Sequence, residues 1–78
     1  MTLKEARSAT GLSQEVFAEK IGVSVSSVRN WEQGRTSISS ASAYTLLHIA
    51  NICNLTDIKQ LSDLVYDTDK VFLAKVGL

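Results

Sequence analysis

Several residue types that carry chemistry are scarce in this sequence of 78 residues, which has no proline, one cysteine and one histidine. The lone cysteine, Cys53, cannot form a disulfide within the chain, and its apolar neighbours indicate a buried thiol in a reducing cytoplasm. His48 has no second histidine to share a metal ion or an acid–base role. No glycine loop for phosphate and no nucleophile–base pair is recognisable. We therefore expect no enzyme, no cofactor and no metal site.

Long apolar runs and net charge are also missing. No apolar stretch approaches the roughly 18 residues that cross a membrane, and the N-terminus lacks a secretory pattern. We expect a soluble, cytoplasmic protein without a membrane partner. Eight Lys and Arg balance eight Asp and Glu, so the net charge is zero. Zero net charge does not exclude an anionic partner, because the potential near a docking face matters more than the sum over the whole chain.

What is present is a repeated set of helix start and stop signals. Each of three short segments begins with a Ser or Thr that can cap a helix and ends at a glycine. The starts are Thr2, Ser13 and Ser24, and the stops are Gly11, Gly22 and Gly34. Thr2 also forms a capping box with Glu5. The intervals match helix lengths, which predicts three helices within residues 3–34.

The remaining residues predict two further helices. Residues 35–42 form a polar loop in which Ile38 is expected to enter the core, followed by a helix over about 41–53. A fifth helix is expected from about Asp57, capped by Thr56, with three apolar residues buried: Ile58, Leu61 and Val65. The final VFLAKVGL is ambiguous between strand, helix and irregular tail. We predict an all-α fold, a compact bundle of about five helices, divided into a main domain (1–65) and a C-terminal tail for packing or dimerisation (66–78).

The second and third predicted helices are joined by only a few residues around Gly22. Ala18 is small enough for a close helix crossing, and Val28 and Trp31 can both face the core. These features describe a helix-turn-helix. At 100° per residue the third helix then turns a polar side outward, at the reach of base edges in a major groove. That side carries Ser26, Arg29, Asn30 and Gln33.

The segment LSQEVFAEKIGVSVSSVRNWEQG (12–34) resembles the helix-turn-helix of the Cro/CI-type (XRE-like) DNA-binding proteins. The matching positions are Leu12-Ser13-Gln14, Phe17-Ala18, Gly22-Val23-Ser24 and Val28-x-x-Trp31-Glu32-x-Gly34. The resemblance covers about residues 3–55. It implies a lambda-repressor-like domain that binds double-stranded operator DNA, usually as a homodimer.

The resemblance also assigns roles to single residues. Gln14 matches a glutamine that contacts a phosphate and steadies the recognition helix, and Arg35 matches a segment that contacts the DNA backbone. Arg7 and Glu32 match an ion pair between the first and third helices. The positions that match contacts to bases or flanking phosphates are Val25, Ser26, Ser27, Arg29 and Asn30. Asn30 is the strongest base reader, because its amide can pair with adenine in bidentate fashion.

Two features depart from the family pattern or stay open. The segment after Gly34 is about three residues longer than usual and lacks the common proline, which weakens the assignment of backbone contacts there. A dimer surface is expected from an exposed stripe and the tail: Tyr44, His48, Ile52 and Phe72. In the alternative, the tail folds back over that stripe within one chain.

The predicted function is a sequence-specific transcriptional regulator, a repressor that binds a two-fold operator through residues 25–33. A protein-interaction module and an antitoxin-type autorepressor are the alternatives. The predicted DNA-facing side carries no carboxylate between its polar residues, and only two or three phosphates per monomer would be neutralised by Lys or Arg.

Overall fold

The computed structural model describes residues 1–77, and within that range it is built from α-helices and one short 3-10 helix. This confirms the predicted all-α fold with five α-helices. The elements are α1 (Leu3–Thr10), α2 (Gln14–Ile21), α3 (Val25–Glu32), the 3-10 helix η1 (Ile38–Ser40), α4 (Ala43–Ile52) and α5 (Ile58–Lys75). Leu78, the last residue of the predicted tail, lies outside the described residues. No helix in residues 1–77 is long and apolar enough to span a membrane.

The first three helices begin at the predicted capping residues. The hydroxyl of Ser13 accepts a hydrogen bond from the amide of Val16, and the hydroxyl of Ser24 accepts one from Ser27. Thr2 and Glu5 form the complete capping box, in which each side chain accepts from the other's backbone amide. Caps of this kind satisfy amides that the helix itself leaves without a partner. The local sequence therefore sets where these helices start.

The fifth helix differs from the prediction at its beginning. Its N-cap is Asp57, whose carboxylate accepts from the amide of Gln60 at 2.9 Å, and Thr56 lies one residue outside. Ile58, predicted to be buried, is 79% exposed. At 100° per residue Ile58 lies about 120° around the helix from Leu64, which is 1% exposed. The prediction for Ile58 was wrong because the buried side of α5 is centred on Leu64.

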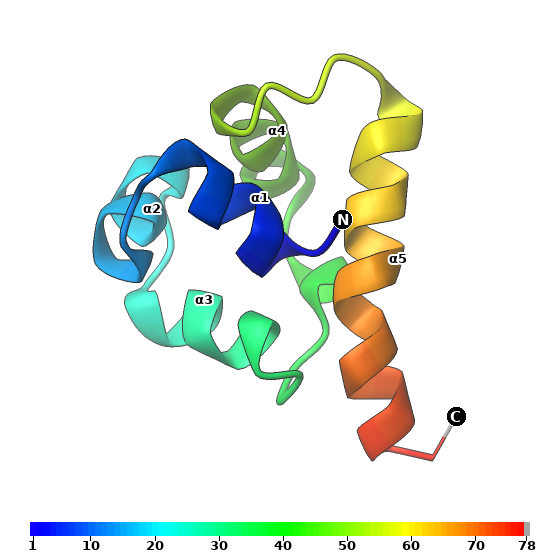
Figure 1. Cartoon of the computed structure of the whole chain (residues 1–78). Coiled ribbons are helices and arrows are strands. Elements are labelled where there is room, and N and C mark those ends of the chain that lie inside the picture. The colour runs from blue at the N-terminus through cyan, green and yellow to red at the C-terminus, as the bar shows by residue number, and fades with distance from the viewer. Residues whose placement is uncertain (78) are drawn as a thin grey trace.

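The ambiguous end of the chain is helical as far as Lys75. The single helix α5 runs through the predicted boundary between residues 65 and 66 without a break. It packs against α1, α3 and η1. Figure 1 shows it (yellow to red) alongside the other helices, with its C-terminal end on the same side of the molecule as α3.

One core holds these elements together. Its fully buried side chains come from every helix and from η1: Leu3, Phe17, Ile21, Val28, Ile38, Ile49 and Leu64. Ile38 is buried as predicted, whereas Cys53 is only half-buried. That partial burial raises the pKa of the Cys53 thiol. The core joins α1–α4 to α5, so the orientation of α3 depends on residues far along the chain.

Candidate nucleic-acid interface

Helix α3 is oriented by two apolar residues on its inner side. Val28 is fully buried and Trp31 is 6% exposed. The opposite side consequently faces solvent, with Ser26 and Arg29 exposed and Asn30 partly exposed. This side of α3 therefore presents hydrogen-bonding groups to solvent.

The other two predicted contact residues, at the start of α3, are less exposed to solvent. Val25 is half-buried and packs against the core. Ser27 is also half-buried, and its hydroxyl lies 3.1 Å from the hydroxyl of Ser24, the N-cap residue. Both residues therefore help to form the start of the helix, and a contact with DNA would use only the parts that remain accessible.

A buried ion pair links α1 to the end of α3. Arg7 Nε donates to Glu32 Oε2 at 2.7 Å and Nη2 donates to Oε1 at 3.2 Å, while Nη1 donates to the carbonyl of Leu12 at 2.9 Å. The Glu32 side chain is 3% exposed and that of Arg7 is 14% exposed. The hydrogen bonds that Arg7 donates to the Glu32 carboxylate raise the pKa of Arg7. This arrangement uses the planar guanidinium, which an ammonium could not replace.

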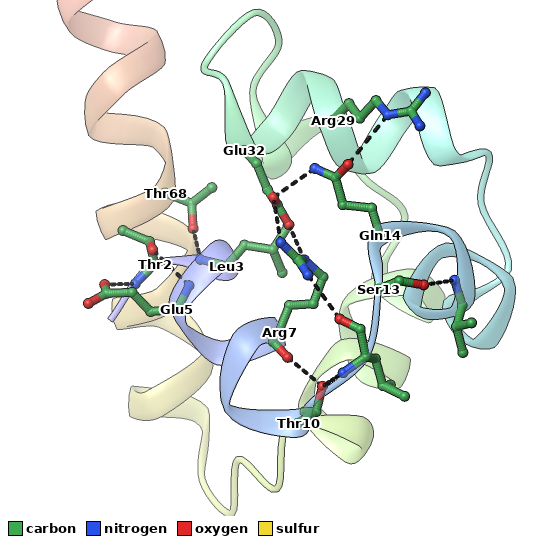
Figure 2. A network of polar contacts seen from close by, with 12 residues as sticks. Thr2, Leu3, Glu5, Arg7, Thr10, Ser13, Gln14, Arg29, Glu32 and Thr68 are labelled. Atoms are coloured by element: carbon green, nitrogen blue, oxygen red, sulfur yellow. Dashed lines mark hydrogen bonds and ion pairs between the residues drawn. The ribbon is translucent and has the colours of Figure 1, made fainter.

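The same carboxylate holds Gln14, the first residue of α2. Gln14 Nε2 donates to Glu32 Oε1 at 3.0 Å, and Gln14 Oε1 accepts from Arg29 Nε at 3.4 Å. Figure 2 shows these side chains as one chain of contacts from Arg7 through Glu32 and Gln14 to Arg29. Gln14 thus connects the buried ion pair to the exposed side of α3. Its amide nitrogen donates to Glu32 and its amide oxygen accepts from Arg29, so both ends of the amide are held in this network.

A carboxylate does lie beside the exposed polar residues of α3, so the prediction that none intervenes was wrong. Glu15 Oε2 is 4.0 Å from Arg29 Nη2, and both side chains are solvent-exposed. Glu15 stands in the first turn of α2, where a negative charge is favourable. The packing of α2 against α3 brings the two together although they are 14 positions apart. Glu15 therefore weakens the positive potential that Arg29 supplies.

The segment after α3 is anchored at a position where only glycine fits. Gly34 has φ +71°, and a Cβ there would lie 2.5 Å from Val71 Cγ1 of α5. Arg35 follows directly, exposed to solvent, and its amide donates to the carbonyl of Asn30 at 2.8 Å. Arg35 is thereby placed at the C-terminal end of α3, next to the polar side that carries Arg29 and Asn30.

Comparison with protein families matched residues 3–58 to a helix-turn-helix family. The match covers more than half of the chain and includes α1 to α4. The chain belongs to the Cro/CI-type (XRE-like) helix-turn-helix family. It is therefore a DNA-binding transcription regulator in the general sense, of a family that is typically not enzymatic. Neither the curated proteins nor the solved structures gave a significant match.

Two polar residues of this helix-turn-helix protein were missed from the sequence, and both lie on α5, beyond the family match. Asp69, 8% exposed, accepts from the amides of Ile38 and Ser39. Its position four residues after Val65 and three before Phe72 marks it as a carboxylate in an apolar stripe, a signal that could have found it. Lys75 Nζ donates to the carbonyl of Gln33 at 2.6 Å. No sequence signal pointed to Lys75.

The four residues predicted as a dimer surface lie on two helices, three on α4 (Tyr44, His48 and Ile52) and one on α5 (Phe72). Tyr44 and His48 stack edge to face, with ring centroids 4.6 Å apart. They line a shallow depression on α4, whereas Ile52 lines another, beside Cys53. Phe72 lines a third, an apolar groove along α5. A dimer contact through these residues stays a prediction.

Proposed function

We propose that this protein is a repressor that binds a two-fold operator as a homodimer, with α3 of each copy in the major groove. The observation that supports this most is the fixed orientation of α3. The interior holds Val28, Trp31 and Glu32. The polar side chains on the opposite side of α3 therefore face solvent in an orientation that the core fixes. A helix presented in this way fits a major groove.

The proposed contacts divide into two kinds. Asn30 and Ser26 would meet base edges, while Gln14, Arg29 and Arg35 would meet phosphates that position the helix. Because few cations take part and Glu15 lies beside Arg29, one copy of the chain would bind weakly. Two copies on one operator would place their recognition helices about 34 Å apart, one turn of DNA. The bound dimer would block access of other proteins to that DNA, which is how it would repress.

Duplex binding measured against salt concentration tests the proposal. Fluorescence anisotropy with a random-sequence duplex should show binding that weakens as salt rises. The logarithmic slope should be about −2 to −3 per monomer, as expected for two or three neutralised phosphates. Sedimentation of the complex gives its stoichiometry. If the chain does not bind duplex even at low salt, the helix-turn-helix would instead serve protein contacts.

Recognition of the DNA sequence by α3 is tested by a substitution at Asn30. After selection of bound sites from random DNA, Asn30→Ala should cost roughly 1–3 kcal/mol of binding free energy on the selected site. The loss should be confined to one base position, where the preference should relax. Asn51→Ala is the matched control, because Asn51 is an exposed asparagine on α4. Site preferences that are identical for the two variants would remove Asn30 from the reading set.

A further inference from the structure

The last turns of α5 lie beside the C-terminal end of α3. Val71 and the backbone of Phe72 approach Gly34 so closely that a Cβ at that glycine would collide with them. One turn later, Lys75 Nζ donates to the carbonyl of Gln33 at 2.6 Å. Figure 1 shows the end of α5 extending past α3, on the side that faces away from α1, α2 and α4. The C-terminal end of α5 therefore lies next to the C-terminal end of α3, where the segment that carries Arg35 begins.

Lys75 places a positive charge at the C-terminal end of α3. An ammonium has three donors, and the bond to Gln33 uses one of them. Within residues 1–77, Lys75 is in no ion pair, whereas Arg29 lies near Glu15 and Lys70 pairs with Asp67. Lys75 is exposed, and it is held two residues from Arg35 by its contact with Gln33. Among residues 1–77, Arg35 and Lys75 are thus two cations that form no ion pair and lie at the end of α3.

We propose that Lys75 binds a DNA phosphate next to the one contacted by Arg35, so that the C-terminal end of α5 is part of the DNA interface. The inference rests on the proposed function and adds a contact on a helix outside the family match. A phosphate oxygen would take one of the remaining N–H donors. The bond to Gln33 would meanwhile restrain the long side chain and reduce the conformational entropy lost on binding.

A purely structural role for Lys75 makes a different prediction. A lysine that contacts the last carbonyls of a helix stabilises that helix end by a few tenths of a kcal/mol to about 1 kcal/mol. If this were its whole role, neutralising Lys75 would lower stability slightly. Its affinity for duplex would then equal that of a variant in which an exposed lysine far from α3 is neutralised. The salt dependence of DNA binding separates the two roles, because only a phosphate contact releases counterions.

The test compares Lys75→Gln with Lys59→Gln, an identical charge change at an exposed lysine near the other end of α5. The two positions are about 24 Å apart along the helix. With one random-sequence duplex over a range of salt concentrations, Lys75→Gln should bind roughly fivefold more weakly per monomer at 0.15 M salt. Its logarithmic slope should be smaller by about 0.9 per monomer. Lys59→Gln should match the wild type in both respects, and Lys75→Arg should restore the wild-type slope.

Three outcomes would overturn the inference. Equal affinities and equal slopes for Lys75→Gln and Lys59→Gln, with a wild type that binds duplex, would refute the contact and leave the proposed function intact. A slope that Lys75→Arg does not restore would also refute it. Failure of the wild type to bind duplex at low salt would overturn both the inference and the proposed function. Urea unfolding of each variant shows that the compared proteins are folded.

Discussion

Replacing Arg7 with methionine should lower the free energy of unfolding by about 3–5 kcal/mol. Methionine keeps most of the apolar stem, so the loss comes from the guanidinium. Without it the Glu32 carboxylate, 3% exposed, retains only the amide of Gln14 as a partner. In a domain of this size such a loss should depress the thermal midpoint by more than about 10 °C. Urea unfolding at low temperature, followed by circular dichroism, measures the effect.

A double variant distinguishes a buried ion pair from a general packing defect. Arg7→Met combined with Glu32→Leu removes both charges, so it should be more stable than either single variant. Arg7→Lys, which keeps the charge but not the planar fork, should lie between the wild type and Arg7→Met. Losses that simply add in the double variant, or a cost below 1 kcal/mol for Arg7→Met, would contradict the buried pair. Loss of DNA binding in an Arg7 variant would report on folding, since this side chain lies in the interior.

The second large effect is expected at Asp69. Its Oδ1 accepts from the amide of Ile38 at 2.8 Å, and its Oδ2 accepts from the hydroxyl of Ser37 at 2.5 Å and the amide of Ser39 at 3.3 Å. Asp69→Ala leaves a buried amide without a partner and should cost about 2–3 kcal/mol of stability. Urea unfolding gives the magnitude, and hydrogen exchange at the Ile38 amide should show a specific loss of protection.

Two further variants calibrate this result. Asp63→Ala, at an exposed aspartate on the same helix, should change stability by no more than about 0.5 kcal/mol. Asp69→Asn retains one acceptor oxygen for Ile38 and should lose about half of what Asp69→Ala loses. Unchanged stability in Asp69→Ala, with full protection retained at the Ile38 amide, would contradict the assignment of Asp69 as the acceptor that holds η1.

The arrangement of α3 explains why stability and DNA binding are hard to separate in this protein. Glu32 is bound to Arg7 in α1 and to Gln14 in α2, and Gln14 in turn contacts Arg29 on the exposed side. We therefore expect a substitution at Arg7 or Glu32 to alter the position of Arg29, a side chain proposed to contact DNA. Lys75 and Asn30 offer cleaner tests, because neither belongs to this network.

Much of the site was predictable because it rests on local signals. The caps at Ser13 and Ser24 and the turn at Gly22 fix the two short helices, and the periodicity of Val28 and Trp31 fixes which side of α3 is buried. The family motif added the roles of single residues. Glu15 was misjudged because its neighbour Arg29 is reached only through the packing of α2 on α3. No spacing within the sequence encodes a contact between exposed side chains 14 positions apart.

The amino-acid sequence by itself determined the all-α fold, the beginnings of the first three helices and the polar side of α3. Short-range hydrogen bonds and helical periodicity decide these features within a few residues. Only the tertiary structure decided which parts of the protein α5 contacts. Its Thr68 accepts from the first amide of α1, and its Asp69 binds the loop after α3. These contacts span 30 residues or more along the chain, and they form only when the core brings α5 against the rest of the protein.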